Sequence, residues 1–313
     1  MPSGKIARWA SLSHPRTGTL AKIIDGQKLA RALRVDLLKR ADAIAARRGT
    51  PPGLAVILVG DDAASAVYVR NKIRACETAG IHSTCLRFPS TVGNDELLTT
   101  ITELNEDAAI DGILVQLPLP PHILLDQVLE AISVEKDVDG FHLYNVGGLV
   151  TGNTIFSPCT PYGVVKLLES ENIAIEGQNV VVVGASNIVG KPMALMLMAR
   201  DATVAICHAK TRDLAQFTIL ADILVVAAGV PGLIIPQMVK TGAVVIDVGI
   251  NRLPDGRITG DVDFEGVSAK ASCITPVPGG VGPMTVTMLL ENTIASAERG
   301  LARSGRLLEN MDS

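Results

Sequence analysis

The stretch NVVVVGASNIVGKPM at residues 179–193 decides the fold, because it combines a buried strand, a tight turn and the start of a helix. Its run of four valines has no polar face, which is typical of a parallel strand covered on both sides. Ser186 stands where the usual G-x-G-x-x-G pattern has its second glycine. Free N–H groups and the helix dipole favour a nucleotide phosphate here over a plain tight turn. The candidate cofactor residues in this turn are Gly184, Ala185, Ser186, Gly190 and Lys191.

Strands and helices alternate on both sides of this junction. After it, short aliphatic runs predict strands at residues 203–207, 223–227 and 243–248. Before it, predicted strands lie at residues 54–60, 86–88 and 112–115, and predicted helices at 65–79 and 95–107. This order predicts parallel sheets. We therefore expect an α/β protein with two domains of parallel sheet flanked by helices, the second Rossmann-like, and a cleft between them.

The domain boundaries follow from this alternation and from the chain length, because 313 residues exceed one domain of about 100–200. We expect the first domain over residues 22–150. We expect the Rossmann-like domain over residues 151–284, with a C-terminal helix in residues 285–313 that packs back onto the first domain. Residues 1–21 contain basic residues and no acid. We expect them to be a disordered extension, with a transit peptide as the alternative.

The composition excludes several classes of protein. The net charge is −4 and no long Lys/Arg block occurs, which argues against a nucleic-acid partner. The five cysteines include no C-x-x-C pair, which argues against a disulfide framework or a metal site and favours the reducing cytoplasm. No apolar run reaches the roughly 18 residues of a membrane span, so we expect no membrane partner.

Three polar residues share one face of the helix predicted at residues 65–79. Ser65, Tyr68 and Lys72 are spaced three and four residues apart. Such a stripe is often only a solvated surface. Here the helix follows a buried strand, so it starts at the carboxyl edge of the sheet, where open α/β sheets bind ligands. We therefore treat all three as candidate site residues.

A second group comes from the strand end at residues 115–120, VQLPLP. Prolines end this strand, so Gln116 projects at the same carboxyl edge, flanked by Val115 and Leu117. Gln116 could be a simple cap, or it could orient the Lys72 amine for acid/base work. A third element, KDVDG at residues 136–140, places Asp139 in a turn that ends in glycine.

The residues after the strand predicted at residues 203–207 indicate whether the cofactor is NAD or NADP. An NAD enzyme usually carries an acid about 20 residues after the glycine turn, to bind the ribose hydroxyls. This sequence instead has His208, Lys210 and Arg212 there, and no acid. A 2′-phosphate would be attracted by the two cations, Lys210 and Arg212, so NADP is favoured over NAD, unless they are ordinary loop residues.

With these segments in this order, the chain resembles the methylenetetrahydrofolate dehydrogenase/cyclohydrolase family over about residues 22–299. The matching motifs are Y-V-x-x-K at 68–72, V-Q-L-P-L-P at 115–120, K-D-V-D-G at 136–140, P-C-T-P at 158–161, G-x-S-x-x-V-G-x-P at 184–192 and P-V-P-G-G-V-G-P-M-T at 276–285. Any one motif could arise by chance, but six in one order are highly specific.

The resemblance implies a bifunctional enzyme of one-carbon metabolism that supports purine biosynthesis, and a homodimer with a tetrahydrofolate substrate. It would oxidise 5,10-methylenetetrahydrofolate with NADP and hydrolyse the methenyl product to 10-formyltetrahydrofolate. Lys72 would be the catalytic lysine, Tyr68 and Gln116 its partners, and Asp139 the pterin anchor. Ile250 would touch the cofactor. The folate side would be lined by Pro278, Gly279, Gly280, Val281 and Gly282.

Two departures from the family pattern weaken the NADP assignment. Many members have Arg where Ala185 stands and Ser where Ala209 stands, so Lys191, Lys210 or Arg212 must hold the 2′-phosphate. Two other readings remain open. One is a two-domain dehydrogenase of the shikimate or amino-acid type, and the other is a binder of folate or nucleotide without catalysis.

Overall fold

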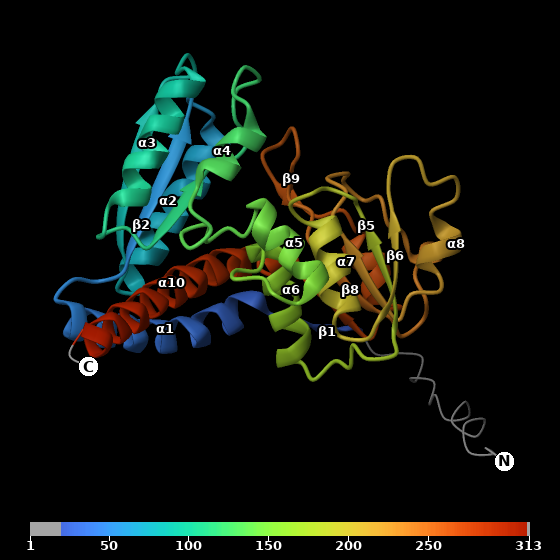
Figure 1. Cartoon of the computed structure of the whole chain (residues 1–313). Coiled ribbons are helices and arrows are strands. Elements are labelled where there is room, and N and C mark those ends of the chain that lie inside the picture. The colour runs from blue at the N-terminus through green and yellow to red at the C-terminus, as the bar shows by residue number, and fades with distance from the viewer. Residues whose placement is uncertain (1–19, 312–313) are drawn as a thin grey trace.

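The computed structural model describes residues 20–311 and shows two α/β lobes side by side (Figure 1). The first lobe has a three-stranded parallel sheet in the order β3-β2-β4. Its strands are β2 (Gly53–Val59), β3 (His82–Phe88) and β4 (Gly112–Val115), and its helices are α2 (Ala63–Thr78), α3 (Asn94–Glu106) and α4 (Leu125–Ala131). Every residue of β2 is buried, which explains its unbroken apolar sequence.

The second lobe has a six-stranded parallel sheet in the order β1-β11-β8-β7-β5-β6. Its strands are β1 (Lys22–Ile23), β5 (Asn179–Val183), β6 (Thr203–Cys207), β7 (Ile223–Val226), β8 (Val244–Asp247) and β11 (Cys273–Ile274). Its helical segments are α6 (Cys159–Ser170), α7 (Gly190–Met198), α8 (Ala215–Thr218), η1 (Pro236–Met238) and α9 (Phe264–Ser268). An antiparallel pair, β9 (Asn251–Arg252) with β10 (Ile258–Thr259), stands apart from the sheet. The expected fold class, two α/β domains with parallel sheets, is confirmed.

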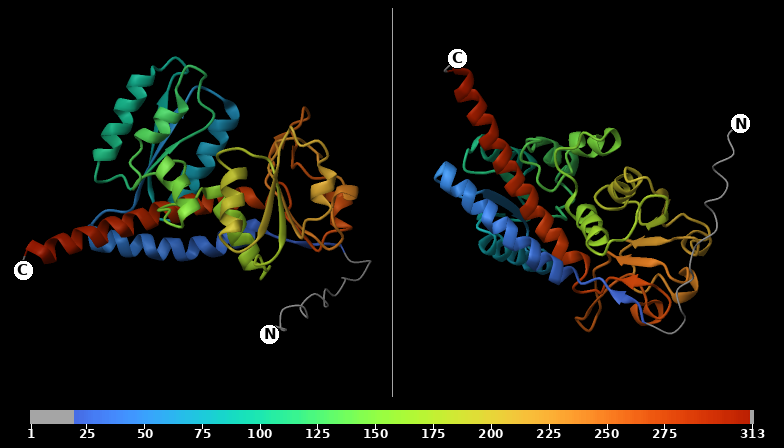
Figure 2. Two further views of the ribbon diagram at one scale, coloured as in Figure 1. Left: turned by 45° about the vertical axis from the view of Figure 1, so that its right-hand side comes forward. Right: turned by 90° about the horizontal axis from the view of Figure 1, so that it is seen from below.

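Two long helices join the lobes. Helix α1 (Gly26–Arg48) and helix α10 (Val281–Met311) run side by side beneath the first lobe, as both views of Figure 2 show. The Arg40 guanidinium on α1 donates to Glu291 and to Glu298 on α10, with N···O distances of 2.8–2.9 Å. Helix α10 also packs against α6 and α2, so it contacts both lobes. The remaining connection is α5 (Leu143–Thr151).

The first described residues pack against the second lobe. The Ala21 N–H donates to the Ser268 carbonyl at 2.8 Å, and β1 pairs with β11 of the six-stranded sheet. Of the extension expected over residues 1–21, residues 1–19 lie outside the part of the chain that the structure describes. No helix in residues 20–311 combines the length and the apolar character that crossing a bilayer requires.

Candidate active site

Helix α2 carries the polar stripe that the sequence singles out. Asp62 caps the helix by accepting from the Ser65 N–H at 2.6 Å, which places the first turn at the carboxyl edge of the β3-β2-β4 sheet. Ser65 is buried, Lys72 is half-buried and Tyr68 is 39% exposed. All three side chains line one cavity of about 390 Å³. The stripe therefore faces a cavity.

Lys72 and Gln116 are bonded to each other in this cavity. The Lys72 Nζ donates to the Gln116 Oε1 at 3.1 Å. Gln116 directly follows β4, where its N–H donates to the Ile57 carbonyl at 2.9 Å, and its Nε2 donates to the Leu117 carbonyl at 2.7 Å. These bonds fix which end of the Gln116 amide faces the amine. Leu117 also lines the cavity, whereas Val115 is buried in β4.

Asp139 lies close to this pair but is not on the lining of the cavity. Burial raises the pKa of the Asp139 carboxyl, and the nearby Lys72 ammonium and a hydrogen bond with Cys159 oppose that rise. Gly140, at φ 77°, has no room for a Cβ, since one would lie 2.6 Å from the Pro158 nitrogen. The turn that carries Asp139 is therefore tightly packed beside the lysine.

Two residues that the sequence reasoning did not identify hold this turn. Asp137 accepts from the N–H groups of Phe141 and His142 and from the Asn145 side chain, at 3.2, 2.8 and 2.8 Å. Burial raises the pKa of Asp137 to about 6. The Asn292 Nδ2, on α10, donates to the Val138 carbonyl at 2.8 Å. A polar residue inside the apolar pattern of the last helix is the feature that could have drawn attention to Asn292.

The opposite wall of the cavity belongs mainly to the nucleotide lobe and to the first turns of α10. The residues on that wall are Thr160, Val189, Val248, Ile250, Val281, Gly282, Thr285 and Val286. Val189 comes from the turn after β5, and Ile250 from the loop after β8. The Thr160 and Thr285 hydroxyls lie 3.0 Å apart and link α6 to α10. The structure thus brings the lysine of one lobe face to face with the nucleotide turn of the other.

The turn between β5 and α7 is tightly packed and leaves main-chain N–H groups without partners among the described residues. Gly184 has φ 121°, and a Cβ there would lie 2.1 Å from the Ala227 carbonyl oxygen. A Cβ on Gly190 would lie 2.0 Å from the Gly184 oxygen. The Ser186 Oγ accepts from the N–H groups of Val189 and Gly190 at 3.1 and 3.3 Å. The N–H groups of residues 185–188 have no hydrogen-bond partner among the described residues, so they remain free for an anion.

The cations expected near the ribose are exposed around the end of β6. His208, Lys210 and Arg212 follow this strand, and the His208 Nδ1 accepts from the Lys210 N–H at 3.1 Å. Lys191 lies at the start of α7, where its Nζ donates to the Asn187 Oδ1 at 2.7 Å. None of these four residues lines the cavity that holds Lys72. They therefore stand apart from the reacting centre, as a ribose phosphate site would.

A pair of buried carboxylates behind Ile250 was also missed. Asp247 accepts from the N–H groups of Gly249, Asp261 and Val262 at 3.0 Å each. Asp261 accepts from the N–H groups of Ala228 and Gly229 and from the Asn251 side chain at 2.7–2.9 Å. Burial raises the pKa of Asp247 to about 6. Acids directly after an apolar strand, as in DVGIN at residues 247–251, could have indicated this network.

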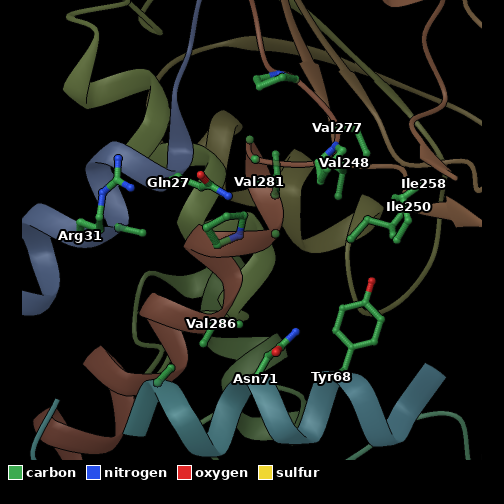
Figure 3. Close-up of a pocket in the computed structure, with 18 of the residues that line it drawn as sticks. Gln27, Arg31, Tyr68, Asn71, Val248, Ile250, Ile258, Val277, Val281 and Val286 are labelled. Carbon is green, nitrogen blue, oxygen red and sulfur yellow. The ribbon is translucent and has the colours of Figure 1, made fainter. Parts of the chain in front are cut away.

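A second cavity, of about 570 Å³, adjoins the first, and Tyr68, Val248, Ile250, Val281, Gly282 and Val286 line both. The predicted folate-side residues from Pro278 to Gly282 all line it. Figure 3 shows Tyr68 and Asn71 pointing into it from α2, with Ile250 and Val248 on the opposite side. Within residues 20–311, no cluster of three or more His, Cys, Asp or Glu side chains could hold a metal ion.

Two family models match the chain. The tetrahydrofolate dehydrogenase/cyclohydrolase catalytic domain matches residues 24–139, and the NAD(P)-binding domain of the same family matches residues 158–301. The bifunctional protein FolD of Nitrosospira multiformis is 61% identical over 283 residues, covering 90% of this chain and 98% of the relative. That of Bordetella petrii is 59% identical over 279 residues, covering 89% and 95%.

Solved structures agree. The bifunctional FolD of Campylobacter jejuni superposes with a TM-score of 0.88 at 52% identity, covering 89% of this chain and 99% of that one. The Trypanosoma brucei methylenetetrahydrofolate dehydrogenase-cyclohydrolase, solved with NADP and an inhibitor, superposes with a TM-score of 0.87 at 39% identity, covering 91% and 99%. The likeness therefore spans both lobes and the cavity between them.

Proposed function

The chain belongs to the tetrahydrofolate dehydrogenase/cyclohydrolase family, and from that premise we propose that Lys72, Tyr68 and Gln116 form the centre at which both family reactions occur. The protein oxidises 5,10-methylenetetrahydrofolate to the methenyl form with NADP and hydrolyses that product to 10-formyltetrahydrofolate. The observation that carries the proposal is the Lys72–Gln116 hydrogen bond in a cavity whose other wall includes Val189 and Ile250 of the nucleotide lobe.

For the oxidation, the chain has to hold two ring systems in contact. NADP supplies the hydride acceptor when bound. Gly184 and Gly190, which have no room for a Cβ, let its diphosphate approach the main chain, and Ile250 bounds the space beside Lys72. The Tyr68 ring offers a flat face to the pterin from the other wall.

For the hydrolysis, the chain has to move one proton. Water attacks the methenyl carbon, which is bonded to two folate nitrogens. One of these two C–N bonds then breaks. Lys72, as the free amine, takes a proton from the attacking water, which leaves a hydroxyl on the former methenyl carbon. When the C–N bond breaks, Lys72 delivers its proton to the departing nitrogen, and the hydroxyl becomes the formyl carbonyl and loses its own proton to solvent. Gln116 accepts one Nζ hydrogen and so aims the amine without adding a charge. Because both reactions change the same carbon, one cavity serves both.

Asp139 binds the substrate in this proposal. A partly buried carboxylate beside Lys72 suits the N–H groups of a pterin, which need acceptors once they leave water. Ser65 and Leu117 line the cavity that contains Lys72, Val115 is buried in β4, and residues 278–282 line the continuation of the cavity. On the nucleotide side, His208, Lys210 and Arg212 with Lys191 receive the 2′-phosphate and select NADP over NAD.

The same proposal extends to the protein's setting: a homodimer in the cytoplasm whose 10-formyl product serves purine biosynthesis. The free edge of β6 supports the dimer, because it carries the exposed Ile206 and pairs only with β5 among the described strands. Five free cysteines suit a reducing compartment. A formyl donor is what purine ring closure consumes.

An assay of the purified protein tests the activity. Added methylenetetrahydrofolate should reduce NADP, NAD should give slower reduction, and 10-formyltetrahydrofolate should accumulate after the methenyl form. A protein that binds folate and NADP but turns over neither step would be the binder considered above. The shikimate and amino-acid alternatives do not survive the family match.

A further inference from the structure

Two loops of the nucleotide lobe lie beside the turn after β5. Strands β5, β7 and β8 are neighbours and run parallel, so the loops that follow them leave the same edge of the sheet. The loop after β7 begins with Ala227, whose carbonyl oxygen would lie 2.1 Å from a Cβ on Gly184. The loop after β8 carries Ile250, which lines the cavity that contains Lys72 and lies opposite Tyr68 (Figure 3). A dinucleotide that crosses this edge therefore meets both loops.

The side chain of Asp261 joins these two loops to each other. Its Oδ2 accepts from the N–H groups of Ala228 and Gly229, in the loop after β7, at 2.7 and 2.9 Å. Its Oδ1 accepts from the Asn251 side-chain amide at 2.7 Å. Asn251 is the first residue of β9 and directly follows Ile250. One carboxylate thus connects the loop that contacts the diphosphate turn to the loop that carries Ile250.

The Asp261 carboxylate is held in place from several sides. The residue is fully buried, and its N–H donates to Asp247 at 3.0 Å. The Ile234 N–H donates to the Asp261 carbonyl at 3.0 Å. A Cβ on Gly249 would lie 2.2 Å from the Asp261 Oδ1, so the loop after β8 packs directly on the carboxylate. A buried charge needs its hydrogen-bond donors, so the two loops and Asp261 fix one another.

We propose that Asp261 is a positioning residue for NADP, which fixes the diphosphate turn relative to Ile250 and so serves the oxidation but not the hydrolysis. The proposal rests on the proposed function, because it requires NADP to extend from the turn after β5 to the cavity beside Lys72. Asp261 is not among the described residues that line either cavity, so it acts through the two loops. The oxidation requires the nicotinamide to contact the folate carbon, whereas the hydrolysis requires water and Lys72. Loss of the connection should therefore impair one of the two activities.

The bond between Asn251 and Asp261 can be broken and restored with little change in side-chain size. Asn251→Asp places a second carboxylate against the Asp261 Oδ1, so the two groups repel each other. We expect the NADP dissociation constant to rise and kcat/KM for NADP to fall, each roughly tenfold. Hydrolysis of methenyltetrahydrofolate, measured without cofactor, should keep the wild-type rate. The double variant Asn251→Asp/Asp261→Asn exchanges donor and acceptor, so the bond re-forms and both NADP values should recover.

Asp255→Ala is the matched control, because Asp255 is an exposed acid between β9 and β10 whose carboxylate bonds to Arg257. It should keep the wild-type NADP affinity. Asn251→Ala, which removes the donor without adding a charge, should show a smaller loss in the same direction as Asn251→Asp. Unchanged NADP binding by Asn251→Asp, equal loss of hydrolysis and NADP reduction, or a double variant no better than the single one would overturn the proposal. NADP reduction by the wild type is the separate test of the proposed function, so the two failures are distinguishable.

Discussion

Two opposing effects act on the pKa of the Asp139 carboxyl. Burial raises the pKa of its carboxyl, and the Lys72 ammonium lowers it. Hydrogen bonds from a substrate to this carboxylate contribute to the free energy of binding. Without the carboxylate, the substrate N–H groups would lose their water and gain no acceptor in its place. Substrate recognition and the placement of the catalytic lysine are therefore coupled through this one residue.

Asp139→Ala should weaken folate binding by roughly 1–3 kcal/mol, because the pterin N–H groups are left unpaired. Calorimetric titration with a non-reacting folate analogue measures the effect, and titration with NADP provides the control, since we expect the NADP diphosphate at the turn after β5 and not at Asp139. An unchanged folate dissociation constant would count against the anchor.

The exposed cations near the nucleotide turn should set cofactor choice. Lys191, Lys210 and Arg212 each offer a charge-assisted bond to a 2′-phosphate, typically worth about 1.5–3 kcal/mol, so NADP should be preferred at least roughly tenfold. Alanine at each position should narrow the ratio of kcat/KM for NADP over NAD. Lys39→Ala, an exposed lysine on α1, should leave the ratio unchanged. If none of the three changes narrows it, the cations do not bind the phosphate.

At the scale of elements, the nucleotide turn depends on two glycines that pack against main chain. Gly190→Ala places a methyl group 2.0 Å from the Gly184 oxygen, so the turn has to open. We expect unfolding free energy to fall by roughly 1–3 kcal/mol and NADP affinity to fall with it. Gly147→Ala in α5 is the matched control, since a Cβ there meets nothing within 4 Å. Urea unfolding and NADP titration measure both, and equal behaviour of the two variants would contradict the role of the turn.

The elements that the sequence could predict are those with unbroken apolar runs. The strands expected at 112–115 and 203–207 are confirmed to the residue as β4 and β6, and the valine run at 180–183 lies in β5. The helix expected after the glycine turn begins at Gly190. Strands of two residues, such as β1, β9 and β10, have too little periodicity to be recognised.

Some residues of the candidate site could be predicted from the sequence and others could not. The Lys72–Gln116 pair was predictable because both residues follow buried strands at one sheet edge. Asn292 and the Asp247–Asp261 pair were not predictable, because they bond to segments distant in sequence. Asp137 was not, because an acid in a turn that ends in glycine is usually only a turn residue. Alternation along the chain contains no information on which turns meet in space.

At the scale of the whole molecule, α1 and α10 fix the two lobes around the shared cavity. The Arg40 bonds to Glu291 and Glu298 join these helices, and Val281 and Gly282 at the start of α10 line both cavities. The lobe that carries Lys72 and the lobe that carries the nucleotide turn therefore share one helical support. The six-stranded sheet leaves its β6 edge on the far side of the second lobe, away from that support.

Pairing of two copies through β6 predicts a dimer that a single charge disrupts. Ile206→Asp should give a folded monomer, because two like charges would meet across the new strand pair. Size-exclusion chromatography with light scattering measures the mass, and circular dichroism verifies the fold. Val35→Asp, at an exposed valine on α1, should remain dimeric. A monomeric wild type, or a dimeric Ile206→Asp, would show that β6 is not the interface.

The most direct test of a single lysine-centred site is the hydrolysis of methenyltetrahydrofolate by Lys72→Met. This variant keeps the apolar stem of the side chain and removes the proton carrier. Lys72→Arg keeps the positive charge but cannot release its proton, so it separates proton transfer from electrostatics. The account predicts that both variants fold, and that both lose hydrolysis by at least roughly 100-fold relative to wild type. Undiminished hydrolysis by folded Lys72→Met would contradict it.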